Sequence, residues 1–431
     1  MRRQAEPAPE PSEGTAVSSP DHLWLPYAQM KTETPPLAVA RTEGTRIILE
    51  DGRALVDGVA SWWTACHGYN HPHIRAAVQH QLEVMPHVML GGLIHAPASD
   101  LARRLCALLG GDFERVFFSD SGSVAVEVAM KMAVQFSLNR GQAGRRRFLA
   151  FKGGYHGDTF ATMSVCDPDE GMHALFGASL ARQVILDMPR DAATSAALDA
   201  ALQAHAHELA AIVVEPLVQG AGGMVFHEPE VLRRLRAAAD RYGLLLIFDE
   251  IFTGFGRTGT MFAHQQAGVA PDIVTLGKGL TGGTLPLAAT VATREVFEAF
   301  WSDDPGKALM HGPTYMANAL ACAAANASLD LFEREPRLDQ VAAIAAQLGE
   351  GLEPCRGTAG VRDVRVMGAI GVVELEAPPD LNVLKRRFVE AGVWVRPFGR
   401  AIYLTPAFTI SPEDLDRLTA AIVQAVRAIA R

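Results

Sequence analysis

Two short apolar runs, each followed by a charged residue, constrain this chain most strongly. Residues 244–248 (LLLIF) have no polar alternation, which predicts a strand covered on both faces, as in a parallel sheet. This run ends in Asp249, and a second predicted strand, residues 272–276, is followed by Lys278 between two glycines. Because parallel sheets open their ligand crevice at the carboxyl ends of their strands, Asp249 and Lys278 are predicted to stand at neighbouring strand ends.

A carboxylate and an amine in these positions suit a cofactor with a basic ring and a reactive aldehyde. The carboxylate would keep a ring nitrogen protonated, and the amine would form a Schiff base. An apolar run that ends in Asp-Glu is also typical of ATPases. Those require a Gly-x4-Gly-Lys-Ser/Thr phosphate loop, which this sequence lacks. A lysine between glycines also occurs in simple turns. Asp249 and Lys278 alone therefore do not decide between a cofactor site and a simple turn.

Composition limits the class of protein. The chain has 431 residues, 49% of them hydrophobic, which is enough for a large core in two or three lobes. A net charge of −9 disfavours a nucleic-acid or anionic-membrane surface. Five scattered cysteines without a Cys-x-x-Cys pair predict reduced thiols in the cytoplasm. No apolar run is long enough to span a bilayer, and residues 1–20 predict a disordered tail rather than a signal peptide.

Strands alternate with helices over most of the chain, and a polar cluster follows each of several predicted strands. These clusters occupy residues 119–123, 152–158, 215–219, 249–257 and 277–283. The alternation predicts a doubly wound, mainly parallel α/β domain with polar groups at one edge of its sheet. After residue 316 short strands and amphipathic helices predict a smaller α/β lobe.

Two further stretches suggest ligand binding. At 119–123 (SDSGS) the predicted turn into a long helix leaves backbone N–H groups free for a phosphate, although a plain helix cap has the same composition. At 152–158 the glycines allow close approach of a ligand, and Tyr155 and His156 offer flat rings. Three histidines within residues 67–73 have metal-like spacing but no acidic or cysteine partner close by, so no metal site is predicted.

Together these motifs resemble the class III pyridoxal-phosphate aminotransferases of fold type I, over nearly the whole ordered length. The segments DEIFTGFGRTG and GKGLTGG, which contain Asp249 and Lys278, are typical of the class. The segments ASWWTACHGYNHP, GGYHGDT and HGPTYM are similar to the branch that acts in biotin biosynthesis. This resemblance implies a ping-pong conversion of 8-amino-7-oxononanoate to 7,8-diaminononanoate, with pyridoxal 5'-phosphate as cofactor and S-adenosylmethionine as amino donor.

The resemblance also implies catalytic roles. Asp249 would hold the pyridinium nitrogen protonated, and Lys278 would bind the cofactor and then move a proton. Tyr27 would contact both substrates and stack on the adenine of the donor. Arg396 would clamp the substrate carboxylate through its planar guanidinium.

The resemblance also implies residues that bind the cofactor or line the substrate channel. Gly122 and Ser123 would hold the phosphate, and Pro313 and Thr314 would reach the phosphate of the neighbouring subunit in a two-fold homodimer. Tyr155 would flank the cofactor ring and, like Lys278, face the substrate, with Asp158 nearby. The substrate channel would be lined by Trp62, Trp63 and Gly312.

Fold type I further implies how the chain is divided. Residues 71–315 would form the large cofactor-binding domain. Residues 316–431 would form the small domain, completed by residues 21–70.

The chain departs from the expected family pattern in three places. Phe252 stands where a small residue is expected, Ala319 stands where proline is expected, and residues 405–409 (TPAFT) replace an aromatic segment. We expect none of these to touch the catalytic groups, although Phe252 and 405–409 could alter the shape of the pocket. Lysine as the donor, or a different class III enzyme acting on ω-amino acids or diamines, are therefore the alternatives.

Overall fold

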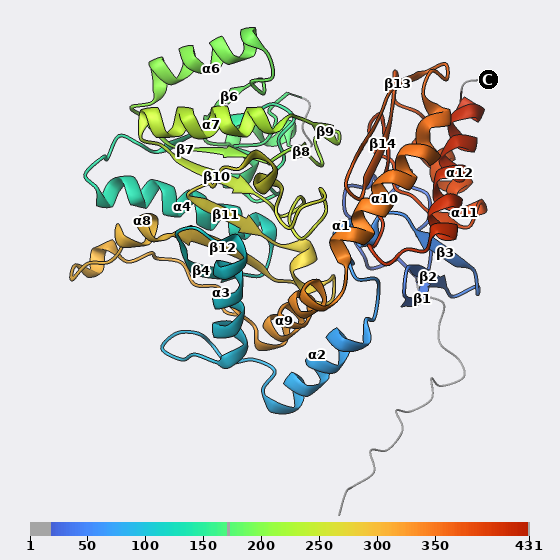
Figure 1. Ribbon diagram of the computed structural model, residues 1–431, viewed down its shortest axis with the longest axis horizontal. Helices are drawn as coiled ribbons and strands as arrows, with labels where there is room; N and C mark the ends of the chain where they lie inside the picture. Colours follow the sequence, from blue (N-terminus) through green and yellow to red (C-terminus); the bar gives the residue numbers. More distant parts are fainter. Residues whose placement is uncertain (1–18, 170–172, 430–431) are drawn as a thin grey trace, which may run out of the picture.

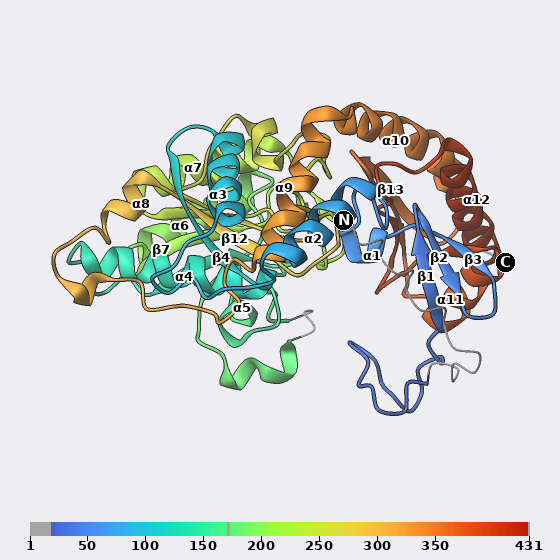
Figure 2. The same ribbon diagram turned by 90° about the horizontal axis from the view of Figure 1, so that it is seen from below.

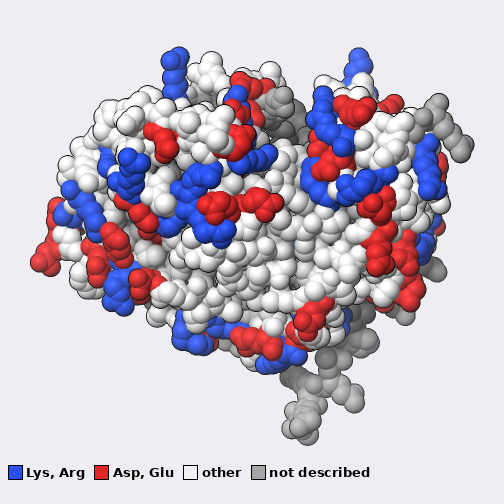
Figure 3. Space-filling view, turned by 45° about the horizontal axis from the view of Figure 1, so that its top comes forward, with Lys and Arg blue, Asp and Glu red and all other residues white. Residues whose placement is uncertain are grey.

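The computed structural model describes residues 19–169 and 173–429, and two lobes lie side by side in it (Figure 1). Of the predicted tail 1–20, residues 1–18 lie outside the described residues. Within the described part of the chain, no helix combines the length and apolar character that crossing a membrane requires. The face seen in Figure 3 carries basic and acidic side chains interspersed, with a broad uncharged area across its middle.

A seven-stranded sheet forms the centre of the larger lobe, in the order β4-β12-β11-β10-β7-β5-β6. Its strands are β4 Phe113–Ser119, β5 Arg147–Phe151, β6 Val184–Leu186, β7 Leu209–Val214, β10 Leu245–Asp249, β11 Ile273–Leu276 and β12 Ala288–Thr293. Strand β12 runs antiparallel to both of its neighbours, whereas the other pairings are parallel. The predicted α/β fold with a mainly parallel sheet is confirmed.

Strand β10 is apolar throughout because helices cover both faces of the sheet. Leu246 and Phe248 pack in one cluster with helix α7 (Pro229–Tyr242) and helix α6 (Ala192–His205). The alternate residues Leu245 and Ile247 point to the other face and pack in another cluster. Burial on both faces removes the polar alternation that a half-exposed strand would show. The opposite cluster is built on helix α4 (Gly122–Asn139).

The smaller lobe contains a three-stranded antiparallel sheet, in the order β13-β14-β16. Its elements are β13 Val361–Met367, β14 Ile370–Leu375, β16 Ala401–Leu404, α10 Arg337–Leu352, α11 Leu381–Glu390 and α12 Pro412–Ile429. A second sheet joins both ends of the chain, because strands β1 Val39–Glu43, β2 Arg46–Leu49 and β3 Ala54–Asp57 continue onto β15 Val393–Trp394. Figure 2 shows these strands beside α11.

The two lobes are connected through α9 (Ala319–Arg334), which packs against α2 (Pro72–Val84) and α3 (Ala96–Leu109) in the larger lobe. The chain then enters α10 on the smaller lobe (Figure 1). The division into residues 21–70, 71–315 and 316–431 stays a prediction.

Most predicted elements are present, and several others were not predicted, among them α2, β6 and α10. Helix α2 follows the histidine-rich loop directly, where His71 caps it by accepting a hydrogen bond from the His73 backbone N–H at 3.3 Å. Strand β6 has only three residues, too few to show a pattern. Helix α10 does carry a signal, since its buried Val341, Ile344, Leu348 and Leu352 follow helical spacing.

Candidate active site

A pocket lies at the carboxyl ends of the strands in the larger lobe. Six residues that were predicted to bind the cofactor or the substrate line it together: Trp63, Gly122, Ser123, Tyr155, Asp249 and Lys278. All but Trp63 end or follow a strand of the large sheet, whose crossovers bring these strand ends to one edge, as expected for a doubly wound fold; Trp63 comes from the turn after β3.

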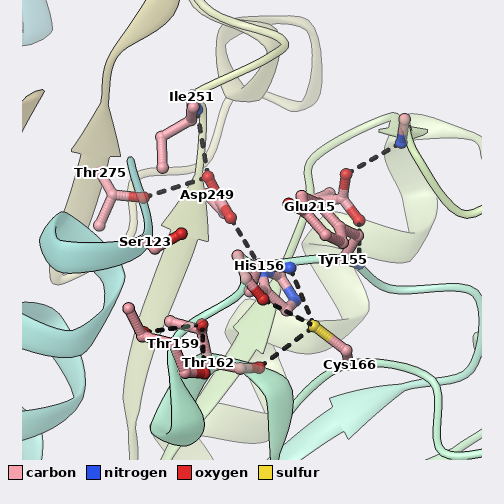
Figure 4. Close-up of polar contacts among 12 residues, drawn as sticks. Ser123, Tyr155, His156, Thr159, Thr162, Cys166, Glu215, Asp249, Ile251 and Thr275 are labelled. Atoms are coloured by element: carbon pink, nitrogen blue, oxygen red, sulfur yellow. Dashed lines mark hydrogen bonds and ion pairs between the residues drawn. The ribbon is translucent and has the colours of Figure 1, made fainter. Parts of the chain in front are cut away.

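Asp249 ends β10 and is held by three hydrogen bonds (Figure 4). Its Oδ2 accepts from Nδ1 of His156 at 2.8 Å, and its Oδ1 accepts from Oγ1 of Thr275 and from the backbone N–H of Ile251, both at 3.2 Å. Burial lowers the pKa of His156, but the hydrogen bond and charge of Asp249 oppose it, and the net shift is upward. The sequence suggested His156 only as a flat ring, so its contact with Asp249 was missed.

Glu250, the next residue, faces away from the pocket and has a structural role. Its carboxylate accepts hydrogen bonds from the backbone N–H groups of Ala263 and His264, at 2.8 and 2.9 Å. The side chains of His264 and Thr253 also contact it, at 2.8 and 3.0 Å. The Asp-Glu pair is therefore split between the pocket and the loop that follows β10.

Lys278 follows β11 and projects into the pocket. Its Nζ lies 4.6 Å from the ring centroid of Trp63 and makes no hydrogen bond within the described chain. Burial lowers the pKa of Lys278, while the charges of Asp249 and Glu215 oppose this shift without cancelling it. A lowered pKa favours the neutral amine, which is the nucleophilic form.

Phe252 corrects one sequence-based expectation. We expected no departure from the family pattern to touch the catalytic groups, but the Phe252 ring lines the pocket and its centroid lies 6.0 Å from Nζ of Lys278. It also packs on Trp63 with ring centroids 4.3 Å apart. Phe252 follows Asp249 by only three residues, so the turn after β10 brings its side chain to the same strand end. Residues 405–409 do not line this pocket, and Phe408 is buried beneath Arg257 instead.

Glu215 at the end of β7 is a further buried acid in the pocket wall that received no predicted role. Its carboxylate accepts hydrogen bonds from the backbone N–H groups of Tyr155 and Gly220, at 3.0 and 2.9 Å. Burial raises the pKa of Glu215 to about 7. The recurrence of polar residues after strands was the signal that could have identified it.

The first turn of α4 forms a cradle suited to an anion. Ser121 caps the helix, and Ser123 Oγ accepts a hydrogen bond from the Asp158 backbone N–H at 3.1 Å. A Cβ atom at Gly157 would overlap the Ser123 side chain, and one at Gly122 would lie 2.9 Å from Ile251. The glycines thus let two loops approach the helix N-terminus, where unpaired N–H groups favour a phosphate.

Three predicted substrate residues stand outside this inner pocket. The ring of Trp62 lies between Tyr27, at a centroid distance of 6.3 Å in an edge-on arrangement, and the guanidinium of Arg396, 4.9 Å from its centroid. Trp62 belongs to a turn, Ala60–Trp63, whose residues all have left-handed backbone angles, with φ from 45° to 75°. Such angles are strained in non-glycine residues and are common at ligand sites. Arg396 forms no ion pair with any residue that the structure describes.

Gly312, Pro313 and Thr314 are not brought to the pocket of their own chain. They lie in the loop before α9, where the carbonyl of Thr314 faces Nε2 of His87 at 3.2 Å.

Two histidines of the histidine-rich loop, residues 67–73, have separate partners. Nε2 of His67 contacts Ser328 Oγ at 3.0 Å, and Nε2 of His73 contacts Asp330 at 2.7 Å.

The class III aminotransferase family model matches residues 27–426. Two curated relatives named adenosylmethionine-8-amino-7-oxononanoate aminotransferase come from Mycobacterium leprae and Corynebacterium glutamicum. They are 48% and 43% identical to this chain, covering 94% and 96% of it and 94% and 99% of their own length.

Solved structures are similar over most of the chain. The adenosylmethionine-8-amino-7-oxononanoate aminotransferase of Methanocaldococcus jannaschii has a TM-score of 0.90 at 32% identity, covering 94% of this chain and 97% of its own. An amine transaminase from an uncultivated Pseudomonas species, solved in its PLP-bound form, has a TM-score of 0.88 at 34% identity, covering 96% and 100%.

Gly157→Ala should weaken binding of pyridoxal 5'-phosphate by about tenfold or more, because the added methyl group displaces Ser123 from the anion cradle. Gly141→Ala is the control, since Gly141 also has a positive φ, 79°, but a Cβ there meets no atom within 4 Å. Cofactor titration followed by visible absorption measures both. Equal affinity in the two variants would contradict the role of Gly157 in shaping the cradle.

Proposed function

Since the chain belongs to the class III aminotransferases, we propose that it transfers an amino group from S-adenosylmethionine to 8-amino-7-oxononanoate, giving 7,8-diaminononanoate in biotin biosynthesis. Its cofactor is pyridoxal 5'-phosphate. The observation that carries the proposal is that Lys278 and Asp249, which accepts three hydrogen bonds, line the same pocket at neighbouring strand ends. Identities of 40–48% to enzymes of this name, over nearly their whole length, support the substrates.

The residues of the pocket fit this cofactor. Asp249 would pair with the ring nitrogen, Lys278 would bind the aldehyde carbon, and the N-terminus of α4 with Ser123 would hold the phosphate. Tyr155 would flank the ring. Bound there, pyridoxal 5'-phosphate supplies an electron sink for the carbon that bears the amino group and carries that group between the two half-reactions.

Lys278 and Asp249 divide the proton chemistry. Lys278 Nζ, in its neutral form, would take the proton from the substrate carbon and pass it on, and the lowered pKa that burial gives this amine favours that form. Asp249 would face the ring nitrogen, and His156, Thr275 and a backbone N–H all donate to its carboxylate and hold it in place. His156 therefore acts through Asp249.

One pocket must accept two unlike substrates in turn, and the outer wall suits both. Each substrate has a carboxylate, and Arg396 offers a guanidinium without a carboxylate partner among the described residues. The faces of Trp62 and Tyr27 suit the adenine of the donor and the aliphatic chain of the keto acid. Phe252 narrows the inner end of this path beside Trp63.

Stopped-flow absorption of the holoenzyme with one amine at a time tests the donor. S-adenosylmethionine alone should bleach the visible band of the lysine-bound cofactor, because the donor half-reaction converts the cofactor to its amine form. Lys278→Ala, which lacks that band, is the control. Bleaching by lysine and not by S-adenosylmethionine would identify lysine as the donor. Bleaching only by ω-amino acids or diamines would favour the alternative class III activity.

We also propose that the site is completed by a second copy of this chain in a two-fold homodimer. Exposed apolar side chains gather on α2, the loop after it and the loop before α9: Leu82, Val84, Met89, Leu93, Ile94, Met310 and Tyr315. The rings of His87 and Tyr315 lie 4.7 Å apart, so the two loops adjoin. Apolar surface of this extent is typical of an interface, and Pro313 and Thr314 lie within it, available to a neighbouring phosphate cradle.

Mixed dimers test the shared site. Thr314→Glu should abolish activity because a carboxylate would repel the neighbour's phosphate, whereas Thr314→Ser is the conservative control. Co-expression of Thr314→Glu with Lys278→Ala should restore about a quarter of wild-type activity, because half of the dimers are mixed and each has one intact site. No recovery in proven mixed dimers would show that Thr314 acts in its own subunit.

A cytoplasmic location is proposed from the cysteines. All five are free, and four of them are buried. Unpaired thiols are typical of a reducing compartment.

A further inference from the structure

Asp158 is the centre of a hydrogen-bond network at the mouth of the pocket. Its Oδ2 accepts from the Tyr27 hydroxyl at 2.5 Å, and its Oδ1 accepts from the Tyr155 hydroxyl at 3.0 Å. The fourth member, His173, contacts Oδ1 through Nε2 at 2.8 Å. Tyr27 and Tyr155 face the proposed substrates and cofactor, but His173 does not line the inner pocket. Neither the motifs nor the proposed mechanism gives it a role.

The surroundings of His173 fix its orientation. The residue is 7% exposed, and its ring stacks on Tyr155 with centroids 5.8 Å apart and an angle of 25° between the planes. Because Nε2 faces a carboxylate oxygen, it must carry the proton and donate. Nδ1 is buried without a partner in the described part of the chain, so the donation to Asp158 is the one polar contact that this buried ring makes there.

Tyr27 depends on this network for its position. It lies in the N-terminal segment outside any helix or strand, is 57% exposed and has a φ of 52°. Its side chain has two hydrogen-bond contacts, with Asp158 and with the Tyr155 hydroxyl at 3.3 Å. Burial and the bond to Asp158 raise the pKa of Tyr27 to about 12, so its hydroxyl remains a donor. A displaced Asp158 carboxylate would release both tyrosine hydroxyls.

Asp158 needs a donor that is itself fixed. Its side chain is half exposed, so the carboxylate could rotate toward water if only the mobile hydroxyl of Tyr27 held it. His173 supplies a rigid N–H from the protein side, and hydrogen bonds to a charged acceptor are about twice as strong as neutral ones. The same Oδ1 also accepts a hydrogen bond from the Tyr155 hydroxyl, so the orientation that His173 gives to the carboxylate also affects Tyr155.

We propose that His173 is a positioning residue that orients Asp158 and, through it, the hydroxyls of Tyr27 and Tyr155 for the amino donor. This inference rests on the proposed function, since it assigns Tyr27 to donor binding. The cofactor itself should still bind without His173, because Asp158 meets the anion cradle through its backbone N–H and not through the carboxylate that His173 contacts.

Two substitutions separate hydrogen bonding from ring packing. His173→Phe keeps a ring against Tyr155 but removes the donor, and it should lower kcat/KM for the donor half-reaction about tenfold, mainly through KM. His173→Gln keeps an N–H at the reach of Nε2 but loses the ring, and it should stay within about threefold of wild type. Both variants should keep the visible absorption band, which shows that they fold and bind the cofactor. Equal losses in the two variants, or no loss in either, would overturn the proposal.

A double-mutant cycle shows whether His173 acts through Asp158. In an Asp158→Ala background, His173→Phe should cause no further loss, because the acceptor of its hydrogen bond is gone. Additive losses would refute the positioning role. Wild-type protein is measured first: if S-adenosylmethionine fails to bleach the band, the proposed donor is wrong, and the same cycle is then run with the amine that does bleach it.

Discussion

The hydrogen bond between His156 and Asp249 joins two side chains that are 1% and 5% exposed, in the wall of the pocket at the end of β10. A carboxylate in such a place is costly unless donors surround it, and here a ring N–H, a hydroxyl and a backbone N–H do so. These three donors come from the loop after β5, from β11 and from the turn after β10. The charged site therefore exists only when the neighbouring strands are in register.

This dependence explains how the fold positions the chemistry. The crossovers bring the ends of β5, β7, β10 and β11 to one edge, and glycines allow the loops to close on the N-terminus of α4. Buried strands supply the inner pocket, where we propose that the cofactor binds. The proposed substrate wall is assembled from elsewhere: Tyr27 from the N-terminal segment, Trp62 from a strained turn, and Arg396 from the smaller lobe. Substrate selection can thus vary while the inner pocket stays constant.

The inner site could be predicted from sequence because its signals are local. The uninterrupted apolar run before Asp249 and the glycines beside Lys278 are consequences of burial and close approach that a single segment displays. The contact between His156 and Asp249 could not be predicted, because it joins residues 93 positions apart. The inward position of Phe252 depends on the turn after β10, and the direction of β12 depends on how it inserts between β4 and β11. Such features arise from tertiary packing, which no local pattern records.

The proposed chemistry depends on Lys278 as the residue that binds the cofactor, and borohydride reduction of the holoenzyme tests this assignment. Reduction converts the bond between cofactor and amine into a stable secondary amine, which survives digestion and peptide mass spectrometry. The peptide containing Lys278 should then carry the cofactor mass. The same mass on the peptide containing Lys131 or Lys152, with the Lys278 peptide unmodified, would contradict it.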